Sequence, residues 1–110
     1  MLLTEYDIEC LKEAKTLIDK NNRQHHTIGD IARAVGMGAT KLKAGFKLYY
    51  GSGLYAYLRE QRMQQAKLQL ADSGKTIKAI AKTMGFKHTS NFTTAFRKRF
   101  GVTPGKWRNR

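Results

Sequence analysis

The sequence contains one pattern twice, and this repeat limits the possible folds more than any other feature. One block returns 49 residues later, with Thr27, Ile28, Ile31, Ala32, Val35, Gly36 and Met37 matched by Thr76, Ile77, Ile80, Ala81, Met84, Gly85 and Phe86. A second block returns 50 residues later, with Leu42, Phe46, Tyr50 and Gly51 matched by Phe92, Phe96, Phe100 and Gly101. The second copy therefore has one extra residue, between Gly85 and Phe92.

Threonine and glycine residues mark the predicted helix ends within each copy. Thr27 is a predicted N-cap, and Asp30, three residues later, completes a capping-box pattern. Gly36 follows an apolar stripe of helical spacing and can adopt the positive φ that a tight turn requires. Thr76 and Gly85 have the same places in the second copy. Each copy therefore predicts a short helix, a turn and a second helix.

Helical periodicity extends over most of the chain, and no segment alternates long enough to form a strand. We expect an all-α fold of seven helices, at residues 5–20, 28–35, 39–50 and 54–72, directly after Thr76, at 89–100 and from Pro104 onward. Proline at the first helical position after Thr103 is a favourable helix start. The third helix should turn either Tyr49 or Tyr50 inward. The long helix at 54–72 connects the two copies and should face a core.

Basic residues dominate the repeated region. The 110 residues include 21 Lys and Arg against 8 Asp and Glu, a net charge of +13. Residues 1–22 have a net charge of −2, whereas residues 23–110 have +15. An excess of this size, confined to the repeat, indicates a polyanionic partner.

Several classes of protein are disfavoured. Cys10 is the only cysteine, so neither an internal disulfide nor a zinc knuckle is expected. The chain has no apolar run of membrane-spanning length and no basic segment at its start that would suggest a signal peptide. Because no catalytic set of side chains is recognisable, we expect no enzyme, no cofactor and no metal site. A cytoplasmic, nucleoid-associated location fits these features.

The spacing of the two copies is that of the helix-turn-helix, a motif that reads DNA. The chain resembles the C-terminal DNA-binding region of the AraC/XylS family of bacterial transcription regulators. The residues that carry the resemblance in the second half are Ile80-Ala81, Gly85-Phe86, Phe92, Phe96-Arg97-Lys98, Phe100-Gly101 and Thr103-Pro104. Those in the first half are Ile31-Ala32, Leu42, Phe46-Lys47, Gly51, Tyr57-Leu58-Arg59, Arg62-Met63 and Ala66.

The resemblance implies a homeodomain-like architecture: a first helix-turn-helix subdomain at residues 1–53, a connecting helix at 54–72 and a second subdomain at 73–110. Each subdomain would place its second helix in one of two successive major grooves. It also implies a contact with RNA polymerase, and a sensing or dimerisation domain that is absent from this chain. We expect a fragment of a longer regulator rather than a freestanding one. Departures from the family pattern occur at Gly38-Ala39-Thr40, Ala44, Lys87-His88 and Trp107.

In the first reading helix, Leu42 and Phe46 should face inward, which leaves a basic outer arc. Lys43 is the best candidate for bonding to guanine, and Thr40 or Ala44 could touch a thymine methyl. Lys41 and Lys47 should contact phosphates.

In the second reading helix, the candidate base contacts are short and polar: Ser90, Asn91 and Thr94. Phosphate contacts are predicted for Lys87, Arg97 and Lys98, and helix N-termini capped by Thr27, Thr76 and Thr103 should lie near DNA. The sequence thus predicts a sequence-specific regulator that binds double-stranded DNA at an asymmetric operator. The alternative is a non-specific nucleic-acid-binding protein, nucleoid-associated or RNA-binding, which the charge alone would fit.

Overall fold

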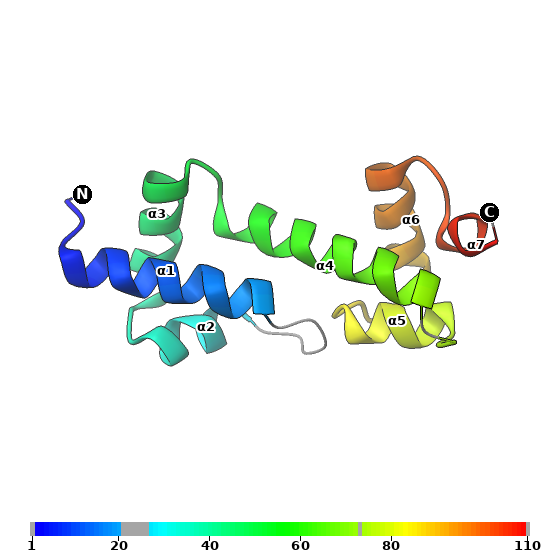
Figure 1. Ribbon diagram of the computed structural model, residues 1–110, viewed down its shortest axis with the longest axis horizontal. Coiled ribbons are helices and arrows are strands. Elements are labelled where there is room, and N and C mark those ends of the chain that lie inside the picture. Colours follow the sequence, from blue (N-terminus) through cyan, green and yellow to red (C-terminus); the bar gives the residue numbers. More distant parts are fainter. Residues whose placement is uncertain (1, 21–26, 73, 110) are drawn as a thin grey trace. The chain divides into compact units, whose positions relative to one another are not determined.

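The computed structural model describes residues 2–20, 27–72 and 74–109, and within these ranges it is all-α (Figure 1). The helices are α1 (Glu5–Lys20), α2 (Ile28–Val35), α3 (Ala39–Tyr50), α4 (Leu54–Asp72), α5 (Ile77–Thr83), α6 (Thr89–Phe100) and α7 (Pro104–Arg108). The predicted seven-helix class is confirmed. None of the described helices is both long enough and apolar enough to cross a membrane.

The chain packs as two compact units that divide α4 between Gln61 and Arg62. The core of the first unit comprises Cys10, Leu11, Ala14, Ile18, Ile28, Ile31, Ala32, Val35, Met37, Leu42, Phe46, Leu54 and Leu58. The core of the second comprises Met63, Ala66, Leu70, Ile80, Ala81, Met84, Phe92 and Phe96. Our division into residues 1–53, 54–72 and 73–110 stays a prediction, and the packing adds that the connecting helix serves two cores.

The turn between the paired helices has two features in common in both units. Gly36 and Gly85 have positive φ angles of 75° and 91°, a region that glycine enters without steric cost. The next residue in each turn donates its N–H back into the preceding helix at 3.0 Å, Met37 to Ala32 O and Phe86 to Ala81 O. These bonds satisfy carbonyls at the helix end.

The extra residue of the second copy lies directly after this turn. Met37 and Phe86 still match at an offset of 49, whereas the N-caps Gly38 and His88 match at 50. The inserted position is therefore Lys87, a residue already predicted to contact phosphate.

The repeat also includes the helix that precedes each copy, which the sequence pattern had not revealed. The buried residues Leu11, Ala14 and Ile18 of α1 correspond, 52 residues later, to the buried residues Met63, Ala66 and Leu70 of α4. At the other end, Leu54 corresponds to Pro104, 50 residues later, and both are buried. The first turns of α4 therefore pack against the first unit as α7 packs against the second. The later turns of α4 have the same place in the second unit as α1 has in the first.

Cation–ring contacts repeat in the same register. The ammonium of Lys15 lies 5.6 Å from the ring centroid of Tyr57, and that of Lys67 lies 4.7 Å from the ring of Trp107. Lys15 and Lys67 are 52 residues apart, and Tyr57 and Trp107 are 50 apart. Trp107, which departs from the family pattern, thus has a structural place that a tyrosine occupies in the first unit.

Tyr50, not Tyr49, is the inward residue at the end of α3. Its ring centroid lies 4.7 Å from that of Phe46, the same separation as between Phe96 and Phe100 in the second unit. Tyr49 is 42% exposed. Gly51 and Gly101 then end the two helices with a φ of 84° each.

Candidate nucleic-acid interface

Helix α3 buries one side and exposes a basic one. Leu42 and Phe46 are completely buried in the core of the first unit, as predicted. The residues predicted to face DNA are all exposed: Thr40, Lys41, Lys43, Ala44 and Lys47. Gly45, between the two sets, lies against α1, since a Cβ placed on it would be 3.5 Å from Leu11.

Helix α6 follows the same plan with different surface chemistry. Phe92 and Phe96 are completely buried in the core of the second unit. The predicted contact residues Lys87, Ser90, Asn91, Thr94, Arg97 and Lys98 are all exposed. Its outer side therefore begins with short polar side chains and ends with cationic ones.

Helices α2, α5 and α7 are capped by threonine, whereas the two outward helices, α3 and α6, are not. The hydroxyl oxygens of Thr27, Thr76 and Thr103 accept the N–H of Asp30, Ala79 and Lys106 at 3.0, 3.0 and 3.2 Å. The three predicted caps are thus present as caps. The N-cap residues of α3 and α6 are Gly38 and His88, and neither makes a side-chain capping hydrogen bond. Their first N–H groups keep their capacity to bind an anion.

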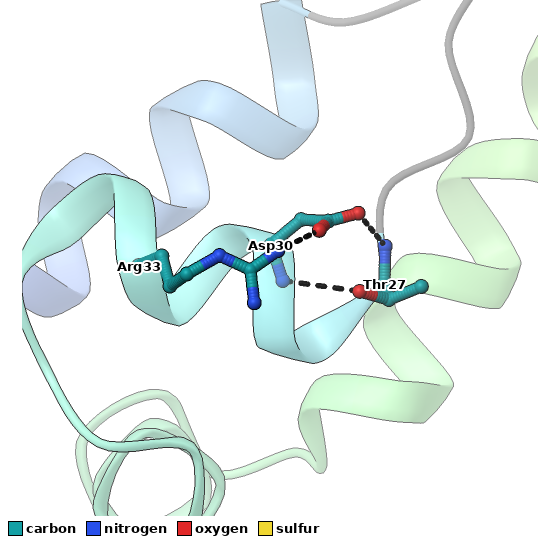
Figure 2. A network of polar contacts seen from close by, with 3 residues as sticks. All are labelled: Thr27, Asp30 and Arg33. Atoms are coloured by element: carbon teal, nitrogen blue, oxygen red, sulfur yellow. Dashed lines mark hydrogen bonds and ion pairs between the residues drawn. The ribbon is translucent and has the colours of Figure 1, made fainter.

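Figure 2 shows the capping box of α2, which the sequence had indicated. The carboxylate of Asp30 accepts the N–H of Thr27 at 3.1 Å and also pairs with the guanidinium of Arg33. This arrangement lies at the start of α2, between its N-cap Thr27 and Arg33. It fixes the start of the helix that supports α3.

An acidic contact that sequence reasoning missed lies at the start of α3. Asp7, in the first turn of α1, is only 3% exposed. One of its oxygens, Oδ1, lies 3.0 Å from the ammonium of Lys41, whose side chain is 50% exposed. The other, Oδ2, accepts the N–H of Thr4 at 3.0 Å. Thr4 and Asp7 have the same spacing as Thr27 and Asp30, so the capping-box signal was available.

The surroundings of Asp7 stabilise its charged form. The hydrogen bond from the backbone of Thr4, followed by that from Lys41, holds the pKa of the Asp7 carboxyl below its usual value. Lys41 is therefore paired with a carboxylate in this structure. Lys43 and Lys47 are also exposed on the same helix.

The turn of the first unit is also tied to α1. The hydroxyl of Tyr6 donates to the carbonyl oxygen of Gly36 at 3.2 Å.

Among the described residues, no group of three His, Cys, Asp or Glu side chains is placed to hold a metal ion. The candidate interface thus consists of exposed cationic and polar side chains on α3 and α6.

Each of the two helix pairs packs one side into a core and presents a basic or polar face of its second helix outward. This arrangement defines a helix-turn-helix protein with two reading helices. A family model described as a helix-turn-helix domain matches residues 31–110. The chain belongs to the AraC-type helix-turn-helix family of transcription regulators.

The HTH-type transcriptional regulator ExsA of Pseudomonas aeruginosa is 33% identical over 98 residues, covering 89% of this chain and 35% of that protein. A transcriptional regulator with an AraC-type DNA-binding domain from Chromobacterium violaceum has a TM-score of 0.78 at 29% identity, covering 96% of this chain and 95% of that chain. The DNA-binding domain of AdpA, solved with a target DNA, has a TM-score of 0.77 at 22% identity, covering 90% and 89%; this last likeness is one of fold.

Proposed function

We propose that the chain binds double-stranded DNA sequence-specifically as the DNA-binding part of a transcription regulator, with α3 and α6 in successive major grooves. The observation that carries the proposal is the division of each helix into a copied buried side and a divergent exposed side. Direct readout requires side chains that reach base edges, and these must differ between helices that read different sequences. The operator should therefore be asymmetric.

Base recognition would come from the first turns of each helix. On α3, Lys43 would bond to guanine and Thr40 or Ala44 would contact a thymine methyl. On α6, Asn91 would bond to adenine, and Ser90 and Thr94 would add polar or methyl contacts. All six side chains are exposed, which supports this assignment.

Phosphate contacts would hold the protein in register without reading sequence. The exposed cations that we assign to this role are Lys47, Lys87, Arg97 and Lys98. The uncapped starts of α3 and α6 and the N-termini capped by Thr27, Thr76 and Thr103 would add backbone N–H groups. Lys41 was predicted for the same role, but in the structure its ammonium lies 3.0 Å from the carboxylate of Asp7.

In-vitro selection of bound duplexes from a random pool tests the proposal. The expected result is an asymmetric consensus of two different half-sites. At the same salt concentration, the protein should bind this consensus at least about 10³-fold more tightly than random duplex, as specific protein–DNA complexes do. Equal affinity for the selected and the random duplexes would instead identify a non-specific nucleic-acid binder, the function that the charge alone would support.

The whole protein's role lies beyond this domain. The chain spans about a third of the length of the curated relatives it matches. We propose that it acts with a sensing or dimerisation domain and contacts RNA polymerase at the promoter, in the cytoplasm at the nucleoid. Co-purification of the polymerase with the operator-bound protein, and its loss without the operator, would test that contact.

A further inference from the structure

Asp7 is a buried acid in direct contact with a helix that, under the proposed function, lies against a polyanion. Its carboxylate has two separate tasks, since Oδ2 accepts the Thr4 N–H at 3.0 Å and Oδ1 binds the Lys41 ammonium at 3.0 Å. The Asp7 N–H in turn donates to the Thr4 hydroxyl at 3.0 Å. The acid is thus fixed by the start of α1, and through Lys41 it holds the first turn of α3.

The second capping box of the same unit shows that this link is not an automatic result of capping. Asp30 also accepts the N–H of its threonine, Thr27, and also binds a cation. That cation, Arg33, belongs to the same helix and is 76% exposed (Figure 2). Of these two ion pairs, Asp30–Arg33 lies within one helix and Asp7–Lys41 joins two helices.

The corresponding positions of the repeat cannot form such a pair. By the register of the buried residues, Asp7 corresponds to Arg59 and Lys41 to Asn91, at offsets of 52 and 50. Both of these residues are exposed. The acid–lysine contact of the first reading helix is therefore not repeated at the corresponding positions of the scaffold.

We propose that Asp7 is a positioning residue for α3, which holds the Lys41 ammonium away from the DNA phosphates and leaves base reading to Thr40 and Lys43. To reach a phosphate, Lys41 would have to leave a carboxylate that is almost completely buried. An unpaired buried charge is strongly unfavourable, so the pair persists when DNA binds. The domain thereby gives up one non-specific contact on the helix that reads bases. This inference rests on the proposed function.

The salt dependence of binding to random duplex counts phosphate contacts, since each one changes the slope of log affinity against log salt by about 0.9. Lys47→Met, which removes a predicted phosphate contact from the same helix, should flatten the slope by about this amount. Lys41→Met should leave it unchanged. Asp7→Asn should release Lys41, steepen the slope by about 0.9 and lower the preference for the selected operator over random duplex. An Asn side chain still offers an oxygen to the Thr4 N–H.

Two controls separate the pair from trivial effects. Glu9→Gln makes the same change in net charge on an exposed position of α1, and it should leave the slope unchanged. The double variant Asp7→Asn/Lys41→Met has neither charge of the pair and should have the wild-type slope. It also tests the proposal in the case that one of the single variants fails to fold. Circular dichroism melts verify folding.

The result that overturns the proposal is a slope flattened by about 0.9 in Lys41→Met and in the double variant, which would place Lys41 on a phosphate. In that case Lys47→Met would also flatten the slope, and the DNA-binding function itself would stand. A wild-type protein with equal affinity for the selected and random duplexes would instead remove the proposed function, and this proposal with it.

Discussion

The two units share a scaffold and differ in their charge. Residues 1–61 contain seven acids and nine bases, whereas residues 62–110 contain one acid, Asp72, and twelve bases. Their buried residues nevertheless correspond almost position by position, from Leu11 and Met63 to Phe46 and Phe96. A duplicated core can therefore support two surfaces of different chemistry, because core packing constrains only the inward side of each helix.

The difference is sharpest at the reading helices. In the first unit, α3 is basic and is held through Lys41 by an acid of α1. In the second, α6 begins with polar side chains and ends with Arg97, Lys98 and Arg99. We infer that the first unit depends more on the exact placement of α3, and the second more on cationic attraction.

The largest effect on stability should come from removing a buried aromatic ring from one core. Phe46→Ala and Phe96→Ala each remove a completely buried ring and should destabilise their own units by about 3–5 kcal/mol. Fluorescence of Trp107, which packs in the second unit only, should report the loss in Phe96→Ala and remain native in Phe46→Ala. Equal loss of the Trp107 signal in both variants would show that the shared helix α4 makes the two units fold as one.

Base reading should respond next. Lys43→Ala and Asn91→Ala should each cost about 1–3 kcal/mol of operator binding and relax the preference at one base pair. Repeating the selection with each variant should show the relaxed position in a different half-site. Relaxation in the same half-site would contradict the assignment of one half-site to each unit.

Arg97→Ala should weaken all duplexes about equally and flatten the salt slope by about one unit. The reason is that a phosphate contact carries no sequence information directly. Binding measured at several salt concentrations, to operator and to random duplex, decides this. A loss confined to the operator would move Arg97 to base reading.

Helix caps should produce a smaller difference between the units. Thr27→Ala and Thr76→Ala each remove one side-chain bond and should destabilise the protein by about 1 kcal/mol. The loss should be greater for Thr27 than for Thr76, because Asp30 then loses the geometry of its capping box, whereas Ala79 at the matching position offers no such partner. Urea unfolding monitored by circular dichroism gives the comparison, and an equal loss would mean that the box adds nothing to the single cap.

The smallest expected effect is a pH dependence confined to the first unit. The pKa of Asp7 is lowered in the folded chain, so its contribution to stability is present above the unfolded pKa of about 3.9 and is lost as the pH falls through the lower, folded pKa. Amide hydrogen exchange between pH 5 and pH 3 should show α1 and α3 weakening before α5 and α6. Asp7→Asn should remove that order, and an unchanged order in this variant would assign the effect to other acids.

The sequence predicted most of the scaffold because helix ends carry local signals. Thr27, Thr76, Gly36 and Gly85 act within a few residues of themselves, and their caps and turns are as expected. The exposure of the predicted contact residues followed in the same way, since Leu42 and Phe46 define the inward side of α3 and thereby the outward one. The roles of those residues toward DNA remain predictions.

Other features were settled only by packing between helices. Tyr49 and Tyr50 are adjacent and equally apolar, and only the contact with Phe46 selects Tyr50. The Thr4–Asp7 spacing was visible in the sequence, but no local rule could connect Asp7 with Lys41, 34 positions away.

The sequence by itself thus determined the helices, their caps and the two copies of the turn, because backbone preferences and hydrophobic period are local properties. The tertiary structure decided that α4 closes one unit and opens the next, and that a buried acid holds one lysine of the first reading helix. Those contacts join residues far apart in the chain, and their energy exists only once burial brings them together.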